Sequence, residues 1–371
     1  MNTTEIGFIY KPEPEMAGIF RWSTDFLEAM SLPVATQPSY EVIPFAVRAT
    51  PFGFSERLLG LVGKYAKKDF LNAFKNYPRF IEAKNGRDPT VWHLASQTFC
   101  RLISHLDGLK IVTVHDLYPH LFQCYASRQD RVSFESQIGL LEKADYIFTV
   151  SESSRREVIA ALNRDPNTVF AIRPATHIPV EPKVAIERSS NEILYVGSET
   201  PRKNLKMLFL ALKKVFEKNA HAKLIKIGRP QWKGAREELI QLANQLGINN
   251  RIEFKDYVPD ISEFYRRAAA VVLVSKHEGF GYSVAEAMQY GCPVIASNLP
   301  VLRETSFNCA EFVDPFDVDS IANSILKVLD NKKLRESLSN DGQNKIRGYG
   351  FEDWQKQMFL AYSKVLSSHR L

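Results

Sequence analysis

Cysteine is scarce in this chain of 371 residues, and long apolar runs are missing from it. The four cysteines lack the close spacing of zinc ligands, which predicts buried thiols in a reducing compartment and no structural zinc. No apolar run reaches the ~18 residues that could cross a bilayer. The start MNTTEIGFIYKPEPE also lacks a basic segment followed by an apolar one. These absences predict a cytoplasmic protein.

Other absences exclude whole classes of fold and function. No repeat of fixed period and no low-complexity tract is visible, which sets aside solenoid and disordered chains. A dinucleotide oxidoreductase would need a G-x-G-x-x-G after an early strand, and none is found there. The composition, 45% hydrophobic and 24% charged, is that of a globular protein. Since the chain is too long for one ordinary core, two domains of roughly 150–180 residues are expected.

The net charge of +6 is unevenly distributed along the chain. Residues 56–87 carry eight basic and three acidic side chains interleaved with apolar ones, the pattern of a basic amphipathic helix. Such a helix could lie on an anionic membrane, where each well-placed Lys or Arg contributes ~1 kcal/mol. An ordinary helix with a core face and a solvated basic face explains the same pattern, so both interpretations stay open. No nucleic-acid partner is predicted.

The first half of the chain alternates predicted strands and helices. Strands are expected at residues 5–10, 40–47, 90–96, 111–116, 146–151 and 168–175, with helices at 23–30, across the basic stretch, at 133–144 and from Ser151 onward. Alternation of this kind predicts a parallel sheet with helices on both faces.

The periodicity fails across residues 176–191, which are interpreted as a linker, and then restarts. Later strands are expected at residues 192–197, 223–228, 251–258, 271–275 and 292–297, with helices at 204–218, 235–246, 261–269, 320–329 and 351–369 and one ended by Gly291. The predicted domains are residues 1–178, residues 190–350 and a C-terminal helix over residues 351–371. In two such doubly wound domains, a ligand site is expected in a cleft at the carboxyl ends of the strands.

Residues 275–298, SKHEGFGYSVAEAMQYGCPVIASN, combine a glycine-hinged turn, a helix and a short apolar strand. A helix reached through Gly279, Phe280 and Gly281 presents backbone N–H groups that attract phosphate. Glu278 and Glu286 repel phosphate but accept hydrogen bonds from hydroxyls. The segment therefore suits a nucleotide sugar, although two glutamates eight residues apart also occur by chance.

Two cations follow the strand at residues 192–197. Arg202 and Lys203 stand just before a helix expected to be capped by Asn204. Arg can bind two oxygens of a diphosphate while Lys supplies a mobile charge, and together they remove the need for a metal ion. A solvated basic turn is the alternative. Neither Arg202 nor Glu278 is expected in the core.

Two other candidates have ordinary structural alternatives. His115 ends the strand at 111–116, where a neutral imidazole could hydrogen-bond a sugar hydroxyl or the backbone carbonyl could support positive charge. Asp317 and Asp319 form an Asp-x-Asp pair, but capping of the helix at 320–329 explains them better than a magnesium site.

These segments resemble the retaining glycosyltransferases of family 4, which have the GT-B fold. The resemblance is specific for YVGSETPRKNLKMLFLAL and the segment from residue 275. The strand IVTVHDL resembles the family's strand ending in His-Asp, which is found notably among bacterial mannosyltransferases such as those of O-antigen synthesis. The resemblance is looser before residue 110, where Ala17-Gly18 of EMAGIFRWSTDFLEAM replaces the usual Gly-Gly pair. KADYIFTVSESSRREVI matches the family around Ser151 and Glu152, although helix capping by Ser151 explains these residues equally well. The resemblance implies two Rossmann-like domains with parallel sheets facing across a cleft.

The resemblance also implies residue roles. Arg202 and Lys203 would bind the donor diphosphate, Glu286 the ribose, and backbone near Arg229 and Val258 the base. Glu278 would bind the donor sugar, aided by the amides that follow it. The implied catalytic residues are His115, Arg202, Lys203 and Glu278, and the implied donor-binding residues are Gly18, Arg202, Lys203, Arg229, Val258, Glu278, Gly279, Phe280, Gly281, Tyr282 and Glu286.

The expected activity is metal-independent transfer of a hexose, with mannose from GDP-mannose preferred, to a hydroxyl of a glycan or lipid-linked glycan. UDP-sugars remain alternative donors. A nucleotide-sugar epimerase or a non-catalytic binding subunit are alternatives of another class. The chain would then act in the cytoplasm, with the basic stretch at 56–87 as a candidate contact to the inner face of the membrane.

Overall fold

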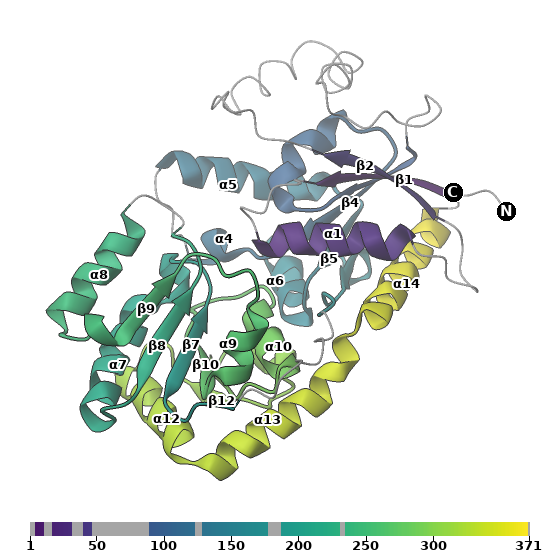
Figure 1. Ribbon diagram of the computed structural model, residues 1–371. Helices are drawn as coiled ribbons and strands as arrows, with labels where there is room; N and C mark the ends of the chain where they lie inside the picture. The colour runs from purple at the N-terminus through teal and green to yellow at the C-terminus, as the bar shows by residue number, and fades with distance from the viewer. Residues whose placement is uncertain are drawn as a thin grey trace. The chain divides into compact units, whose positions relative to one another are not determined.

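The computed structural model describes residues 4–10, 17–31, 40–46, 89–122, 128–176, 187–230 and 234–369 (Figure 1). The chain divides into two compact units. The N-terminal unit comprises Met1–Ala175 together with Phe351–Leu371, and the C-terminal unit comprises Thr176–Gly350. The basic stretch at 56–87 lies outside the described residues.

A six-stranded parallel sheet forms the centre of the N-terminal unit, in the order β2-β1-β3-β4-β5-β6. Its strands are β1 (Thr4–Tyr10), β2 (Tyr40–Ala46), β3 (Val91–Leu94), β4 (Leu109–Val114), β5 (Tyr146–Thr149) and β6 (Val169–Ala171). Strands β3 and β5 are buried along their whole length, as expected for a sheet covered on both faces.

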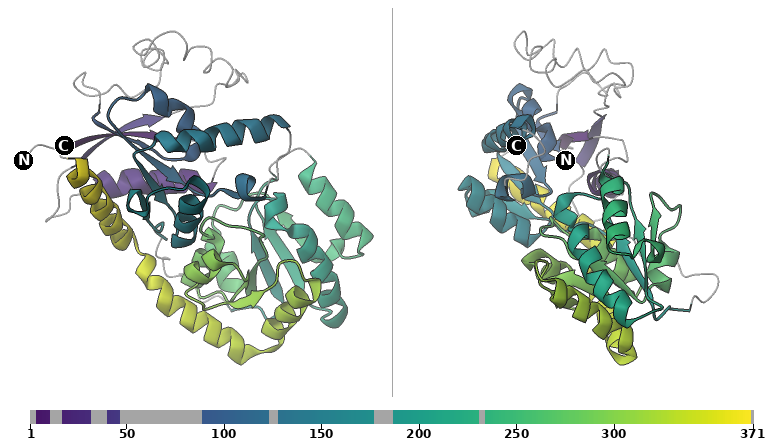
Figure 2. Two further views of the ribbon diagram at one scale, coloured as in Figure 1. Left: turned by 180° about the vertical axis from the view of Figure 1, so that it is seen from behind. Right: turned by 90° about the vertical axis from the view of Figure 1, so that its left-hand side faces the viewer.

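Helices of the N-terminal unit follow its strands along the chain. They are α1 (Ala17–Ser31), α4 (Tyr118–Phe122), α5 (Arg128–Leu140), α6 (Glu152–Leu162) and α14 (Phe351–His369), with 3₁₀ turns η2 (Gln97–His105), η3 (Leu141–Lys143) and η4 (Pro166–Thr168). The last of the helices, α14, comes from the far end of the sequence. Figure 2 shows it, in yellow, beside the other elements of this unit.

Aromatic side chains attach α14 to the N-terminal unit. Trp354, Met358 and Tyr362 repeat every four residues and are buried. The Trp354 ring lies 6.1 Å from that of Trp22 on α1, in a T-shaped arrangement. The helix therefore completes the core of this unit, which two distant parts of the chain build together.

The C-terminal unit contains a second six-stranded parallel sheet, in the order β12-β11-β10-β7-β8-β9. Its strands are β7 (Glu192–Val196), β8 (Lys223–Ile227), β9 (Ile252–Lys255), β10 (Ala270–Leu273), β11 (Val294–Ser297) and β12 (Glu311–Val313). The chain moves outward from β7 to β9 and then returns to place β10 on the other side of β7. The order of strands therefore reverses between β7 and β10, the position where doubly wound sheets bind ligands.

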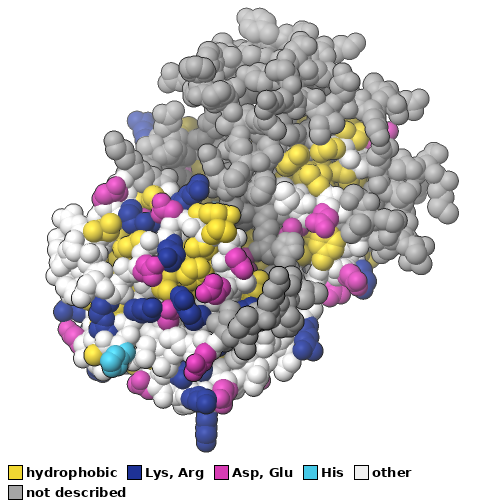
Figure 3. Space-filling model, viewed as in Figure 1, with side chains coloured by type: hydrophobic (Ala, Val, Ile, Leu, Met, Phe, Trp, Pro, Cys, Tyr) yellow, Lys and Arg dark blue, Asp and Glu magenta, His cyan; other side chains and the backbone are white. Residues whose placement is uncertain are grey.

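Helices lie on both faces of this second sheet (Figure 1). They are α7 (Leu205–Lys218), α8 (Ala235–Gln245), α9 (Ser262–Arg267), α10 (Tyr282–Gln289), α11 (Pro300–Thr305), α12 (Val318–Asp330) and α13 (Lys332–Ile346), with 3₁₀ turns η5 (Pro201–Lys203), η6 (Asn249–Arg251) and η7 (Arg347–Tyr349). On the face of the unit drawn in Figure 3, basic and acidic side chains are interspersed.

Three predicted helix ends are confirmed. Ser151 caps α6 by accepting a hydrogen bond from the Ser154 N–H at 2.9 Å. Asp317 caps α12 by accepting from the N–H groups of Asp319 and Ser320. Gly291 adopts φ +64°, the left-handed conformation that ends a helix such as α10.

The predicted loop at Ala17-Gly18 is wrong, because α1 begins at Ala17 and both residues belong to its first turn. The buried residues Trp22, Phe26 and Met30 repeat every four positions, and this period continues back to Gly18 in the sequence. The first N–H groups of a helix need no partner within it, so a glycine costs little there.

The thiols of Cys100 and Cys292 are buried, as predicted, while Cys309 is half-buried and Cys124 lies outside the described residues. Burial raises the pKa of Cys100 to about 12 and that of Cys292 to about 11. No helix within the described ranges is both long enough and apolar enough to span a bilayer.

Candidate active site

The loops that follow β7 and β10 are joined where the strand order reverses. The Lys276 N–H donates to the Arg202 carbonyl at 2.8 Å. The Asn204 side-chain amide donates to the carbonyls of Val274 at 3.0 Å and Pro315 at 2.7 Å. Asn204 is itself left-handed, with φ +60°, and makes no side-chain cap to α7. The predicted cap is therefore wrong, because this side chain connects three loops instead.

Arg202, Lys203 and Glu278 meet at this position and form a charged triad. Arg202 Nη1 lies 2.9 Å from Glu278 Oε2, and Lys203 Nζ lies 2.6 Å from Glu278 Oε1. Arg202 also donates to the His277 carbonyl at 3.3 Å. The sequence prediction named all three residues but did not pair them with one another.

Glu278 is more deeply buried than expected, since only 7% of its side chain is exposed. Burial alone would raise the pKa of its carboxyl, but Lys203 and Arg202 outweigh burial and lower the pKa to about 2. The expectation that Glu278 lies outside the core is therefore wrong. Because both cations pair with it, the carboxylate remains ionised and fixes the two basic side chains in place.

A rigid turn leads from Glu278 into α10. Gly281 has φ +91°, and a Cβ atom there would lie 2.6 Å from Leu302 Cδ2, so glycine is required. The Phe280 carbonyl accepts a hydrogen bond from Thr305 Oγ1 at 2.5 Å. Gly279 and Phe280 are buried and Tyr282 is half-buried. The turn directs the positive end of the α10 dipole toward the loop that carries Glu278.

Glu286 lies two turns further along α10 and is half-buried. Its Oε2 accepts a hydrogen bond from the Tyr265 hydroxyl at 2.7 Å. The Tyr265 ring stacks on Tyr290 with 5.6 Å between the centroids. Tyr265, which the sequence prediction missed, therefore orients the Glu286 carboxylate.

Arg229 and Val258 follow β8 and β9, the next two strands beyond β7. Arg229 is exposed and Val258 is half-buried. Gly228, just before Arg229, has φ +135°, and a Cβ atom there would lie 2.2 Å from the Gly197 carbonyl oxygen. The loops after β7 and β8 are therefore in close contact.

His115 belongs to the N-terminal unit and directly follows β4. Its Nε2 lies 2.8 Å from the Ala95 carbonyl, and its ring meets Trp22 at 89°. Burial lowers the pKa of His115, although the bond to Ala95 and the charge of Asp116 oppose the shift. The imidazole is therefore neutral near pH 7, with Nε2 as the donor to Ala95 and Nδ1 as an acceptor.

A second charged cluster was missed by the sequence prediction: Lys226 on β8, Glu199 after β7, Arg236 on α8 and Asp256 after β9. One signal was available. Lys226 stands inside the predicted strand at 223–228, and in a sheet covered on both faces a side chain inside a strand is buried whichever face it points to.

The Asp-x-Asp pair has structural partners. Asp317 caps α12, and Asp319 lies 2.6 Å from Lys214 Nζ. Within the described ranges, no group of three or more His, Cys, Asp and Glu side chains is placed to hold a metal ion.

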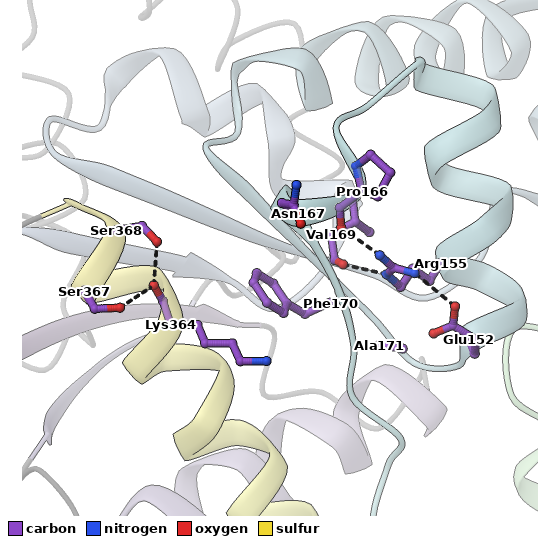
Figure 4. A pocket seen from close by; sticks show the side chains of 10 residues that line it. All are labelled: Glu152, Arg155, Pro166, Asn167, Val169, Phe170, Ala171, Lys364, Ser367 and Ser368. Carbon is purple, nitrogen blue, oxygen red and sulfur yellow. Dashed lines mark hydrogen bonds and ion pairs between the residues drawn. The ribbon is translucent and has the colours of Figure 1, made fainter.

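A cavity of about 470 Å³ lies elsewhere, in the N-terminal unit between α6, β6 and α14. In Figure 4, Arg155 reaches along its wall toward Glu152, while Lys364 comes from α14. The Arg155 guanidinium is satisfied by Glu152 and by the carbonyls of Val169 and Pro166. None of the predicted catalytic or donor-binding residues lines this cavity.

Comparison with known proteins agrees with the arrangement of the C-terminal unit. A family model described as glycosyl transferases group 1 matches residues 180–345. O-antigen chain mannosyltransferase B of Escherichia coli is 30% identical over 269 residues, which cover 68% of this chain and 69% of the relative. The chain belongs to the glycosyl transferases group 1 family. This glycosyltransferase is also 26% identical to the O-antigen chain mannosyltransferase RfbU of Salmonella typhimurium over 258 residues, covering 68% of this chain and 69% of that one.

A solved structure of similar architecture is sucrose-phosphate synthase from Thermosynechococcus elongatus. Its TM-score is 0.72 at 18% identity, over 98% of this chain and 100% of that chain. The predicted GT-B fold, with two parallel-sheet α/β domains, is thus confirmed.

Proposed function

We propose that this glycosyltransferase moves a hexose, preferably mannose from GDP-mannose, to a hydroxyl of a glycan or lipid-linked glycan in surface polysaccharide synthesis. The observation that carries the proposal is the Arg202–Lys203–Glu278 triad at the strand reversal of the C-terminal sheet. The choice of mannose is supported by the two O-antigen mannosyltransferases that this chain is similar to.

The triad suits a nucleoside diphosphate sugar. Arg202 and Lys203 would bind the diphosphate and stabilise the negative charge that grows as it departs. The first amides of α10 would add to this stabilisation. Glu278 would accept hydrogen bonds from sugar hydroxyls and Glu286 from the ribose, while the backbone near Arg229 and Val258 would bind the base. Gly18 in the first turn of α1 would approach the donor phosphate or the acceptor.

The reaction would retain the anomeric configuration by a front-face route. Glu278 is a poor candidate for a general base or nucleophile, because its pKa of about 2 makes it weakly basic. A phosphate oxygen of the leaving group would instead help to remove the acceptor proton. His115 would assist through its Nδ1 acceptor or its carbonyl.

Transfer would need no metal ion, since two side-chain cations already neutralise the leaving group. This proposal rests on the charges of Arg202 and Lys203, which flank Glu278 on both oxygens. Their combined charge exceeds that of the carboxylate, so a diphosphate would meet a net positive site.

The test is a thermal-shift screen of the full chain with GDP, UDP, ADP and their sugars, followed by transfer with the donor that binds. GDP-mannose should raise the melting temperature more than the other sugars, because a ligand of the native state stabilises it. Nuclear magnetic resonance of the product should show the donor's anomeric configuration. Stabilisation by UDP-sugars alone would exclude GDP-mannose, and inversion would exclude the front-face route. Conversion of the donor sugar without an acceptor would instead identify an epimerase, and binding without any turnover would identify a non-catalytic subunit.

A further inference from the structure

A cluster of four charged side chains, two of them fully buried and Asp256 exposed, ties together the loops that follow three neighbouring strands. Lys226 Nζ lies 2.5 Å from Glu199 Oε1 and donates to the Gly228 carbonyl at 2.6 Å. Arg236 Nε lies 2.6 Å from the same Glu199 oxygen. Arg236 Nη2 donates to the Gly228 carbonyl at 3.0 Å and pairs with Asp256 Oδ1 at 2.8 Å. Glu199 and Gly228 are therefore each held by two cations.

Stability alone is a poor explanation for this cluster. The side chains of Lys226 and Glu199 are both fully buried. Burial lowers the pKa of Lys226 to about 8 despite the attraction of Glu199, so the charged form is less favoured in the folded chain than in water, although it still predominates at pH 7. Two apolar residues of similar size often stabilise a core as well as a buried ion pair does. In some proteins a buried ion pair instead fixes one conformation.

The cluster and the Gly228 carbonyl that it binds lie close in the sequence to the predicted contact points of the donor. Glu199 precedes Arg202 by three residues and Gly228 directly precedes Arg229. Asp256 precedes Val258 by two residues, and Arg236 joins it to Glu199. The Glu199 carboxylate thus links the loop proposed to bind the diphosphate with the loop after β8, and Arg236 extends the link to the loop after β9.

We infer that Glu199, Lys226 and Arg236 are positioning residues for the nucleotide, because they fix the relative placement of the loops after β7, β8 and β9. This inference rests on the proposed function. The cations facing Glu199 are Lys226 and Arg236, and the carboxylates facing Arg236 are Glu199 and Asp256. Loss of the Lys226 charge would free one side of Glu199 and loosen the Gly228 carbonyl.

The test measures nucleotide dissociation constants by calorimetry from pH 7 to pH 9 for the full chain. Lys226→Met removes the charge while keeping similar length, and Glu199→Gln keeps an acceptor oxygen. At pH 7 both variants should bind GDP, or the nucleotide that the unaltered chain prefers, about tenfold or more weakly. Lys214→Met is the matched control, because Lys214 forms an exposed pair with Asp319 at 2.6 Å, and its affinity should change less than about twofold.

The pH profile separates positioning from simple stabilisation. In the unaltered chain, affinity should fall as pH rises through about 8, where Lys226 loses its proton. Lys226→Met should lack this step. The free energy of unfolding should instead rise as pH increases above about 8. Lys226 has a lower pKa in the folded chain than an unfolded lysine has, so loss of its proton favours the folded state. Should Lys226→Met not fold, Glu199→Gln supplies the affinity comparison.

Two failures are distinguishable. If the unaltered chain binds none of GDP, UDP and ADP, both the proposed function and this inference are overturned. If it binds a nucleotide and both variants match it within about twofold at every pH, only the positioning role is overturned. Equal pH profiles in the unaltered chain and Lys226→Met would also overturn it.

Discussion

The hydroxyl oxygen of Tyr362 lies 2.5 Å from Nδ1 of His93, although 269 positions separate the two residues. The other ring nitrogen of His93 lies 2.7 Å from Thr113 Oγ1. Burial lowers the pKa of His93 to about 3, with His115 adding to the shift, so the ring is neutral. A central strand of the N-terminal sheet is thus hydrogen-bonded to α14.

Tyr362→Phe should lower the free energy of unfolding by about 1–3 kcal/mol, because it leaves a buried ring nitrogen without its partner. Chemical denaturation at pH 7 measures the change. Tyr146→Phe is the control, since its hydroxyl lies 3.2 Å from His369 near the end of α14 and is only partly buried. Equal losses in the two variants would contradict the special role of the His93 contact.

Arg202→Ala and Lys203→Ala should each reduce the transfer rate by about 10²–10³-fold, because each removes a cation that stabilises the leaving diphosphate. Steady-state kinetics with the donor found in the thermal-shift screen measures this. Lys206→Ala is the control, since Lys206 follows three residues later but is 69% exposed in its pair with Glu238. A rate for Arg202→Ala close to that of Lys206→Ala would remove Arg202 from the site.

Glu278→Gln should change the pH dependence of the free energy of unfolding. The folded pKa of Glu278, about 2, is below its ordinary value of 4.5. The ion pairs therefore contribute fully above pH 4.5, and the contribution disappears as pH falls to about 2. This contribution of the ion pairs to the free energy of unfolding is on the order of 3 kcal/mol. Unfolding free energies of Glu278→Gln should be lower at pH 7 and converge with those of the unaltered chain as pH approaches 2; a constant gap would contradict the assignment.

Transfer should continue after chelation, because Arg202 and Lys203 supply the positive charge that a metal ion would provide. The measurement is the transfer rate after dialysis against a chelator, with and without added Mg²⁺ or Mn²⁺. A rate that vanishes on chelation and returns with either ion would show that the two side chains are insufficient.

If residues 56–87 attach the chain to a membrane, the chain should bind vesicles that contain anionic lipid and should be released from them at high salt. Co-sedimentation with anionic and neutral vesicles measures this. Replacing Lys64, Lys67 and Lys68 by Gln should weaken binding, whereas Lys332→Gln, an exposed lysine on α13, should not. Equal binding to both vesicle types would favour the ordinary-helix interpretation of this stretch.

Much of the fold is predictable because the sheet strands are short apolar segments followed by helices with clear ends. The prediction was weakest where such signals are absent. β12 has only three residues, and α13 is largely polar with the sequence KKLRESLSNDGQNKI. Neither carries enough periodicity to be distinguished from a loop.

At the site, residue types were predictable but partnerships were not. Arg202 and Lys203 follow one predicted strand and Glu278 follows another, so the sequence places them in two loops at the same edge of the sheet. That Glu278 contacts both cations depends on β10 lying next to β7, which is a property of strand order. Asn204 shows the same limit, since its amide reaches Val274 and Pro315 instead of capping the helix that it precedes.

Because α14 supplies Trp354 and Tyr362 to a core begun by β1, the N-terminal unit cannot finish folding when its own strands leave the ribosome. The contiguous C-terminal unit is translated before that helix and can fold first. Until α14 emerges, Trp22 and Phe26 lack the Trp354 and Tyr362 rings that contact them in the folded unit.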